Sequence, residues 1–180
     1  MVKKKLILTA LAIACVLALG IGATVAFIAT VAGPVENTFT IGDIELTLEE
    51  TTGEKYQLIP GASISKNPKV TVGSGSEDCW LFVKITKKGN PDSYLEYSVA
   101  EGWMPLLGHK DVYYRTVSEI AEDKVFGILA NDIITVKESL TKEQMKGIEE
   151  KPTLTFTAYA VQSHGIDSAA AAYNAILAEE

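Results

Sequence analysis

The chain has 180 residues, which is enough for one domain with a hydrophobic core but not for two. It carries 16 basic and 23 acidic side chains, a formal net charge of −7. Because an acidic domain repels phosphate backbones, this balance excludes nucleic-acid binding as an expected function. The two cysteines, Cys15 and Cys79, are too few for a disulfide framework or a cysteine-rich zinc site.

The N-terminus has the pattern of an export signal. Three lysines precede an apolar stretch over residues 6–33 that contains no charged side chain. Small residues follow its first part, and Thr24 and Ala26 fit the −3 and −1 positions of a signal-peptidase site. We therefore expect a helical signal peptide over residues 1–26 and a mature chain that starts at Phe27.

Two other interpretations of this stretch stay open. It is long enough to span a bilayer as a retained anchor, and Thr30 with Ala32 offers a second, weaker cleavage site. The residues before Cys15 resemble a lipoprotein signal only loosely, because the apolar run continues well past the cysteine. Cleavage and a retained anchor both place the following domain outside the cytoplasmic membrane, either secreted or at the cell surface.

Strand patterns dominate the chain from residue 38 onward. Ile44, Leu46 and Leu48 alternate with polar residues, the period-two pattern of a half-buried strand. The strongest pattern covers residues 80–87, where apolar side chains on both faces predict a central strand. Further strands are expected at residues 38–42, 69–72, 97–99, 112–117, 124–128, 133–137 and 154–161.

Two short helices complete the expected fold. Residues 140–148 have a helical pattern with Thr141 as the N-terminal cap. Residues 168–177 are alanine-rich, with Asp167 or Ser168 as the cap. Short strands separated by turn signals predict an all-β, jelly-roll-like β-sandwich over residues 38–180.

Few residues have the pattern of a catalytic or metal site. His109 and His164 are far apart, form no HExxH motif and are expected in turns. Cys79 opens an apolar strand, which favours a buried thiol over a Cys/His nucleophilic pair. A weak calcium site in the loop over residues 74–78 is an alternative without supporting ligand spacing. We expect no enzyme activity, no catalytic residue, no metal ligand and no cofactor.

The segment over residues 27–37 is unusually apolar for a mature N-terminus. Its large apolar residues are Phe27, Ile28, Val31 and Val35. An exposed segment of this kind is prone to aggregation, so it must be covered. It can lie in the protein's own core, add as a strand to a neighbouring molecule, or belong to a longer signal or anchor.

Several segments together resemble the TasA/camelysin family, which comprises secreted proteins of Gram-positive bacteria that the signal peptidase SipW processes. After the lysine-rich signal, the matching segments are residues 36–44 (ENTFTIGDI), 58–61 (LIPG), 66–72 (KNPKVTV), 76–84 (SEDCWLFVK) and 154–162 (LTFTAYAVQ). The resemblance covers both ends of the chain and is thin between residues 89 and 152.

The resemblance implies a jelly-roll subunit of a cell-surface or biofilm-matrix fibre. Subunits of such fibres, identical or related, join by donor-strand exchange, and residues 27–37 would be the donor strand here. Pro34 is a departure, because it has no N–H and interrupts a continuous ladder. The family's other activity is a camelysin-like secreted metalloprotease, but the match carries no zinc-ligand set. A third hypothesis is a monomeric, membrane-anchored binding module that uses Trp103 and the loop over residues 60–66.

Overall fold

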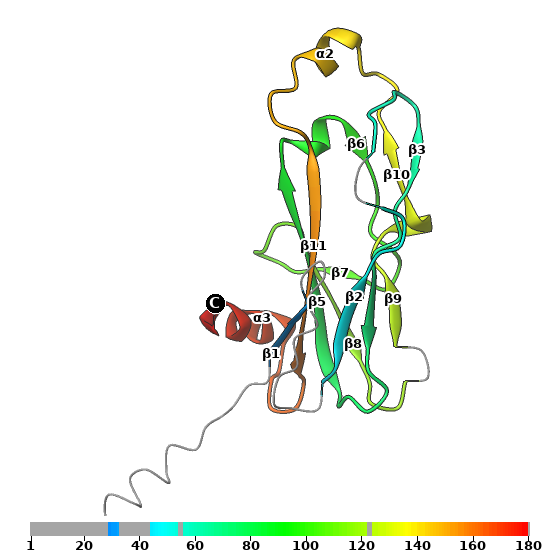
Figure 1. Ribbon diagram of the computed structural model, residues 1–180. Coiled ribbons are helices and arrows are strands. Elements are labelled where there is room, and N and C mark those ends of the chain that lie inside the picture. The colour runs from blue at the N-terminus through cyan, green and yellow to red at the C-terminus, as the bar shows by residue number, and fades with distance from the viewer. Residues whose placement is uncertain (1–28, 33–43, 54–55, 122–123, 180) are drawn as a thin grey trace, which may run out of the picture.

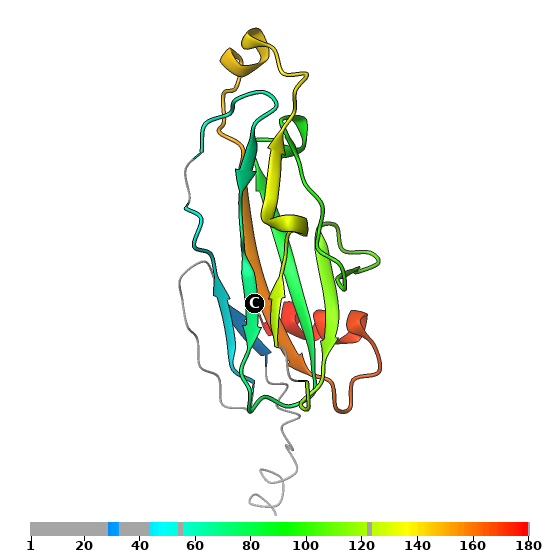
Figure 2. The same ribbon diagram turned by 90° about the vertical axis from the view of Figure 1, so that its right-hand side faces the viewer.

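The computed structural model describes residues 29–32, 44–53, 56–121 and 124–179. These residues form mostly β-structure with few short helices, which confirms the expected all-β class. The described body is elongated and has two layers of sheet (Figures 1 and 2). The expected signal helix and the expected strand at residues 38–42 lie outside the described residues.

The first layer is a five-stranded antiparallel sheet in the order β1-β11-β5-β8-β7. Its longest strands, β5 and β11, pair along their whole length. The position of β5 in the middle of this sheet confirms the central strand expected from the sequence. The strand bounds are β1 Ala29–Ala32, β5 Cys79–Lys88, β7 Met104–Pro105, β8 Val112–Val117 and β11 Thr153–Gln162.

The second layer consists of two three-stranded sheets, one beyond the other along the length of the body (Figure 1). One has the order β2-β4-β9, with β2 Leu46–Glu49, β4 Lys69–Val72 and β9 Val125–Gly127. The other has the order β3-β10-β6, with β3 Ser63–Ser65, β10 Ile133–Val136 and β6 Leu95–Glu96. The expected strand at residues 97–99 is wrong, since only Val99 forms an isolated bridge, with Leu129.

The helices are short, and their caps follow the sequence. Helix α2, Lys142–Lys146, begins with the expected Thr141 in a reciprocal capping box with Gln144. Helix α3, Ala169–Glu179, begins after Ser168, whose Oγ accepts a hydrogen bond from the Ala171 N–H. Two 3-10 helices, η1 Pro91–Ser93 and η2 Ala130–Asp132, connect strands. No helix in the described part of the chain is both long and apolar enough to cross a membrane.

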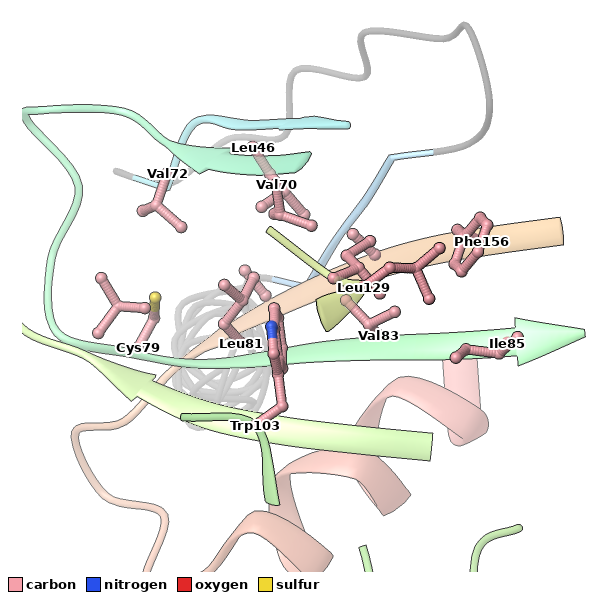
Figure 3. Close-up of a cluster of buried hydrophobic side chains, with 14 of the residues drawn as sticks. Leu46, Val70, Val72, Cys79, Leu81, Val83, Ile85, Trp103, Leu129 and Phe156 are labelled. Atoms are coloured by element: carbon pink, nitrogen blue, oxygen red, sulfur yellow. The ribbon is translucent and has the colours of Figure 1, made fainter. Parts of the chain in front are cut away.

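The main hydrophobic core lies between the two layers (Figure 3). Leu81 and Val83 of β5 are fully buried and face Val70 and Val72 of β4. Burial of each such side chain stabilises the fold by about 1.5–3 kcal/mol. The alternation of β5 therefore directs one set of apolar residues into the space between the layers.

A second core covers the outer face of the five-stranded sheet. Phe82, Tyr159 and Val161 point to this face and pack against Tyr173 and Ile176 of α3. The Phe82 and Tyr173 rings lie 5.2 Å apart at a tilt of 47°. Both faces of β5 and β11 are thus buried in the half that α3 covers, whereas Thr153 and Thr155 on the outer face of the other half are exposed. The edges of this sheet are the places where a further strand can add.

Candidate functional site

The edge of the five-stranded sheet beside β11 is the candidate functional site. Strand β1 pairs there antiparallel with β11, from Ala29 opposite Val161 to Ala32 opposite Ala158. Val31, an expected donor-strand residue, lies opposite Tyr159. The other expected residues of signal processing and of the donor strand lie outside the described part: Thr24, Ala26, Phe27, Ile28 and Val35.

One hydrogen bond at the end of β11 shows to which side each residue of this strand directs its N–H and C=O. The Ser163 N–H donates to the Asp78 carbonyl at 2.8 Å, so the main-chain groups of residue 163 face β5. In an antiparallel ladder successive residues point to alternate sides. Odd-numbered residues of β11 therefore direct their N–H and C=O groups to β5. Even-numbered residues direct these groups to the β1 side.

Strand β1 covers only half of this edge. It pairs with residues 158–161, whereas β11 begins at Thr153. Beside the half that no described strand covers lies a groove of about 570 Å³ between β11 and the end of β2. Its lining residues are Leu48, Glu49, Glu50, Thr51, Gly53, Lys66, Pro68, Leu154, Thr155 and Phe156. Sequence reasoning did not find this groove, because no local pattern identifies the residues that meet there.

Hydrogen bonds hold one wall of the groove in place. The Lys66 ammonium bonds the Glu50 carboxylate and donates to the Gly53 carbonyl at 3.2 Å. Asn67 accepts from the Thr51 N–H at 3.1 Å and donates to the Thr51 hydroxyl at 2.9 Å. These contacts fix the segment that follows β2 against the chain before β4, so the groove is preformed.

The alternative calcium site is occupied by a side chain of the protein itself. Lys124 is only 6 % exposed, and its ammonium donates to the carbonyls of Gly73, Ser74 and Ser76 at 3.4, 3.4 and 3.1 Å. A cation that used these oxygens would have to displace the ammonium. Elsewhere in the described chain, no three His, Cys, Asp or Glu side chains gather as a metal site.

The histidines and Cys79 lie in the surroundings that the sequence predicts. His109 is in a turn, with its ring edge-on to Tyr173 at 4.9 Å, and His164 is in an exposed turn. Cys79 is 1 % exposed in the core between the layers, and burial raises the pKa of its thiol to about 12. A thiol held neutral in this way is a poor nucleophile.

Trp103 is a core residue and not an exposed binding residue, which corrects this detail of the binding-module hypothesis. It is 8 % exposed, and its Nε1–H donates to the Gly127 carbonyl at 2.8 Å. The Arg115 guanidinium lies over the Trp103 ring at 5.5 Å and over the Phe126 ring at 3.9 Å. Together these side chains close the space between β8 and β9.

No family model, curated protein or solved structure matches this chain. The resemblance to the TasA/camelysin family therefore rests on the sequence segments alone, and the candidate site rests on its geometry.

Proposed function

We propose that this chain is a secreted structural subunit of a cell-surface or biofilm-matrix fibre with jelly-roll topology. In this proposal a SipW-type signal peptidase removes residues 1–26. The freed N-terminal segment of one subunit then pairs with β11 of the next subunit, in the position that β1 occupies on its own β11. The mechanism is assembly and involves no catalysis.

The position of β1 at the edge of the sheet carries this proposal. Among the strands that the structure describes, its four residues pair with β11 alone. A strand at an edge can leave without breaking any ladder inside the sheet, and an identical strand of another subunit can make the same pairs. When each subunit donates its strand to one neighbour and accepts the strand of another, the contact is head-to-tail and extends into a fibre; a reciprocal exchange between two subunits would close a dimer.

A disulfide trap tests whether β1 and β11 of different subunits pair. Ala29 lies opposite Val161, which directs its main-chain groups to β5, so this is a non-hydrogen-bonded pair on the β1 side. The Cα atoms of such pairs are about 4.5 Å apart, within the range of a disulfide. A chain that starts at Phe27 and carries Ala29→Cys and Val161→Cys would be incubated at neutral and mildly acidic pH and then oxidised.

Strand exchange predicts a ladder of covalent multimers on a non-reducing gel, which reductant collapses to monomer. Pairing within one subunit gives only monomers with an internal disulfide, and that result at every pH would contradict the proposal. Chains with Ala29→Cys alone are the matched control, because they can link at most in pairs through this position. Cys79 is common to all variants and is buried.

Electron microscopy provides a second, independent readout. A chain that starts at Phe27 should form filaments, whereas a chain that starts at Thr38 lacks the donor segment and should not. Size-exclusion chromatography of both chains measures the species that remain in solution. Filaments from the shorter chain would place the assembly contact elsewhere in the protein.

A further inference from the structure

The uncovered half of β11 presents main-chain groups that have no partner in the described residues. By the alternation along β11, Leu154 and Phe156 direct their N–H and C=O towards the groove. Phe156 is only 5 % exposed, yet no strand of the described chain is hydrogen-bonded to it on this side. Main-chain groups at such a position pair readily with an added strand.

The groove beside these groups has an apolar floor and a charged rim. Leu48, Pro68 and Phe156 supply apolar surface, and Glu49 and Glu50 lie at the rim. The Glu50 carboxylate is bound by Lys66, whereas Glu49 forms no ion pair among the described residues, although Lys69 lies opposite it on β4. The floor fits an aliphatic side chain, and the free carboxylate fits a basic one.

A direct continuation of the β1 register would place a proline opposite Phe156. If the register of β1 continued by two residues, position 34 would come opposite Phe156. Phe156 directs both main-chain groups to this side, so its partner must provide an N–H as well as a carbonyl. Position 34 is a proline, which has no N–H to donate.

We propose that this groove binds an extended, proline-free segment of a partner protein by β-strand addition to Leu154 and Phe156. The segment pairs its main chain with β11, places an aliphatic side chain over the floor and a basic side chain beside Glu49. The bound strand continues the line that β1 begins, so it extends an existing ladder. This site does not require strand exchange between subunits, because β1 occupies the other half of the edge.

Amide hydrogen exchange on the full chain tests the proposal directly. The probe is a synthetic, acetylated peptide of sequence Lys-Val-Thr-Val-Thr. At saturation it should slow exchange of the Leu154 and Phe156 amides by at least about tenfold, equivalent to ~1.4 kcal/mol. The same peptide N-methylated at its central residues should have no effect. Protection of these two amides before peptide is added would overturn the proposal, because the edge would already be paired.

Substitutions in the groove separate this site from unspecific binding. Leu48→Trp fills the groove and should abolish the protection, whereas Leu177→Trp on the exposed side of α3 should leave it unchanged. Glu49→Lys keeps the groove open and should weaken the lysine peptide while it strengthens a glutamate version. Equal protection in all these variants, or protection that depends on protein concentration without peptide, would overturn the inference.

Discussion

The substitution Trp103→Phe tests whether Trp103 closes the core, as the structure indicates. The change keeps an aromatic ring beside Arg115 but removes the N–H that donates to Gly127 at 2.8 Å. Because the indole is only 8 % exposed, water cannot readily replace this donor at the Gly127 carbonyl. A carbonyl left unpaired in this way costs about 1–3 kcal/mol. We expect the free energy of unfolding to fall by about 2 kcal/mol.

The chain contains a matched control for this substitution. Trp80 also donates its Nε1–H to a carbonyl, that of Ile166, but at 3.3 Å and from a partly buried position. The bond is longer and the indole that makes it is less buried than that of Trp103, so Trp80→Phe should cost less than about 1 kcal/mol. The same chemical change is thus made at two positions that differ in burial and bond length.

Urea denaturation followed by far-UV circular dichroism measures both variants, because this signal does not depend on the tryptophans. For a domain of this size, a loss of 2 kcal/mol also lowers the melting temperature by about 4–8 °C. Equal costs for the two substitutions, or wild-type stability of Trp103→Phe, would refute the reasoning. Trp103 would then be accessible to solvent, and the binding-module hypothesis would regain its aromatic contact residue.

Two further predictions concern buried chemistry and backbone conformation. The Cys79 thiol, with its pKa raised to about 12 by burial, should resist alkylation at pH 9 in the folded protein and react once urea unfolds it. The unfolded thiol ionises near its ordinary pKa of 9.0, so this group lowers the free energy of unfolding between pH 9 and 12. Cys79→Ala should make that fall shallower, and the remaining slope comes from Lys87 and Tyr97, whose pKa values are also raised in the folded protein. Gly89→Ala should destabilise more than Gly108→Ala, as thermal denaturation can measure. Both glycines have positive φ, a conformation that costs an alanine about 1–2 kcal/mol. Only at Gly89 would the added Cβ also clash, because it would lie 2.5 Å from the Lys151 carbonyl oxygen.

The parts of the fold that the sequence predicts well are those in which burial imposes a regular pattern. Strands β4 and β8 have the expected bounds, and β5 and β11 differ from them only at their ends. In β11 the apolar residues that face the core alternate with those under α3, so the period of two is visible in the sequence. Capping residues such as Thr141 act locally, which is why the helix starts were predictable.

The short strands could not be predicted in this way. Strands β6 and β7 have two residues each, and β3 has three, too few to show a period. Their existence depends on the partner that lies beside them, as with Leu95 and Glu96 against β10. The expected strand at residues 97–99 is reduced to one bridge, from Val99 to Leu129, because its neighbour there is the short connection between β9 and η2 and not a strand.

At the candidate site, the sequence indicates where pairing along β1 weakens, but it does not indicate that β1 pairs with β11. Along β1, Thr30 and Ala32 lie opposite Ala160 and Ala158, the residues that direct their main-chain groups to β1. The next such position in the sequence is a proline, which has no N–H to donate, so the sequence shows where a continued ladder would lose a hydrogen bond. Nothing in the local pattern, however, shows that the ladder forms on β11 or that β11 continues beyond it. The structure shows this only where β1, near the start of the chain, meets β11, near its end: among the described strands β1 reaches Ala158, and Leu154 and Phe156 lie beyond it.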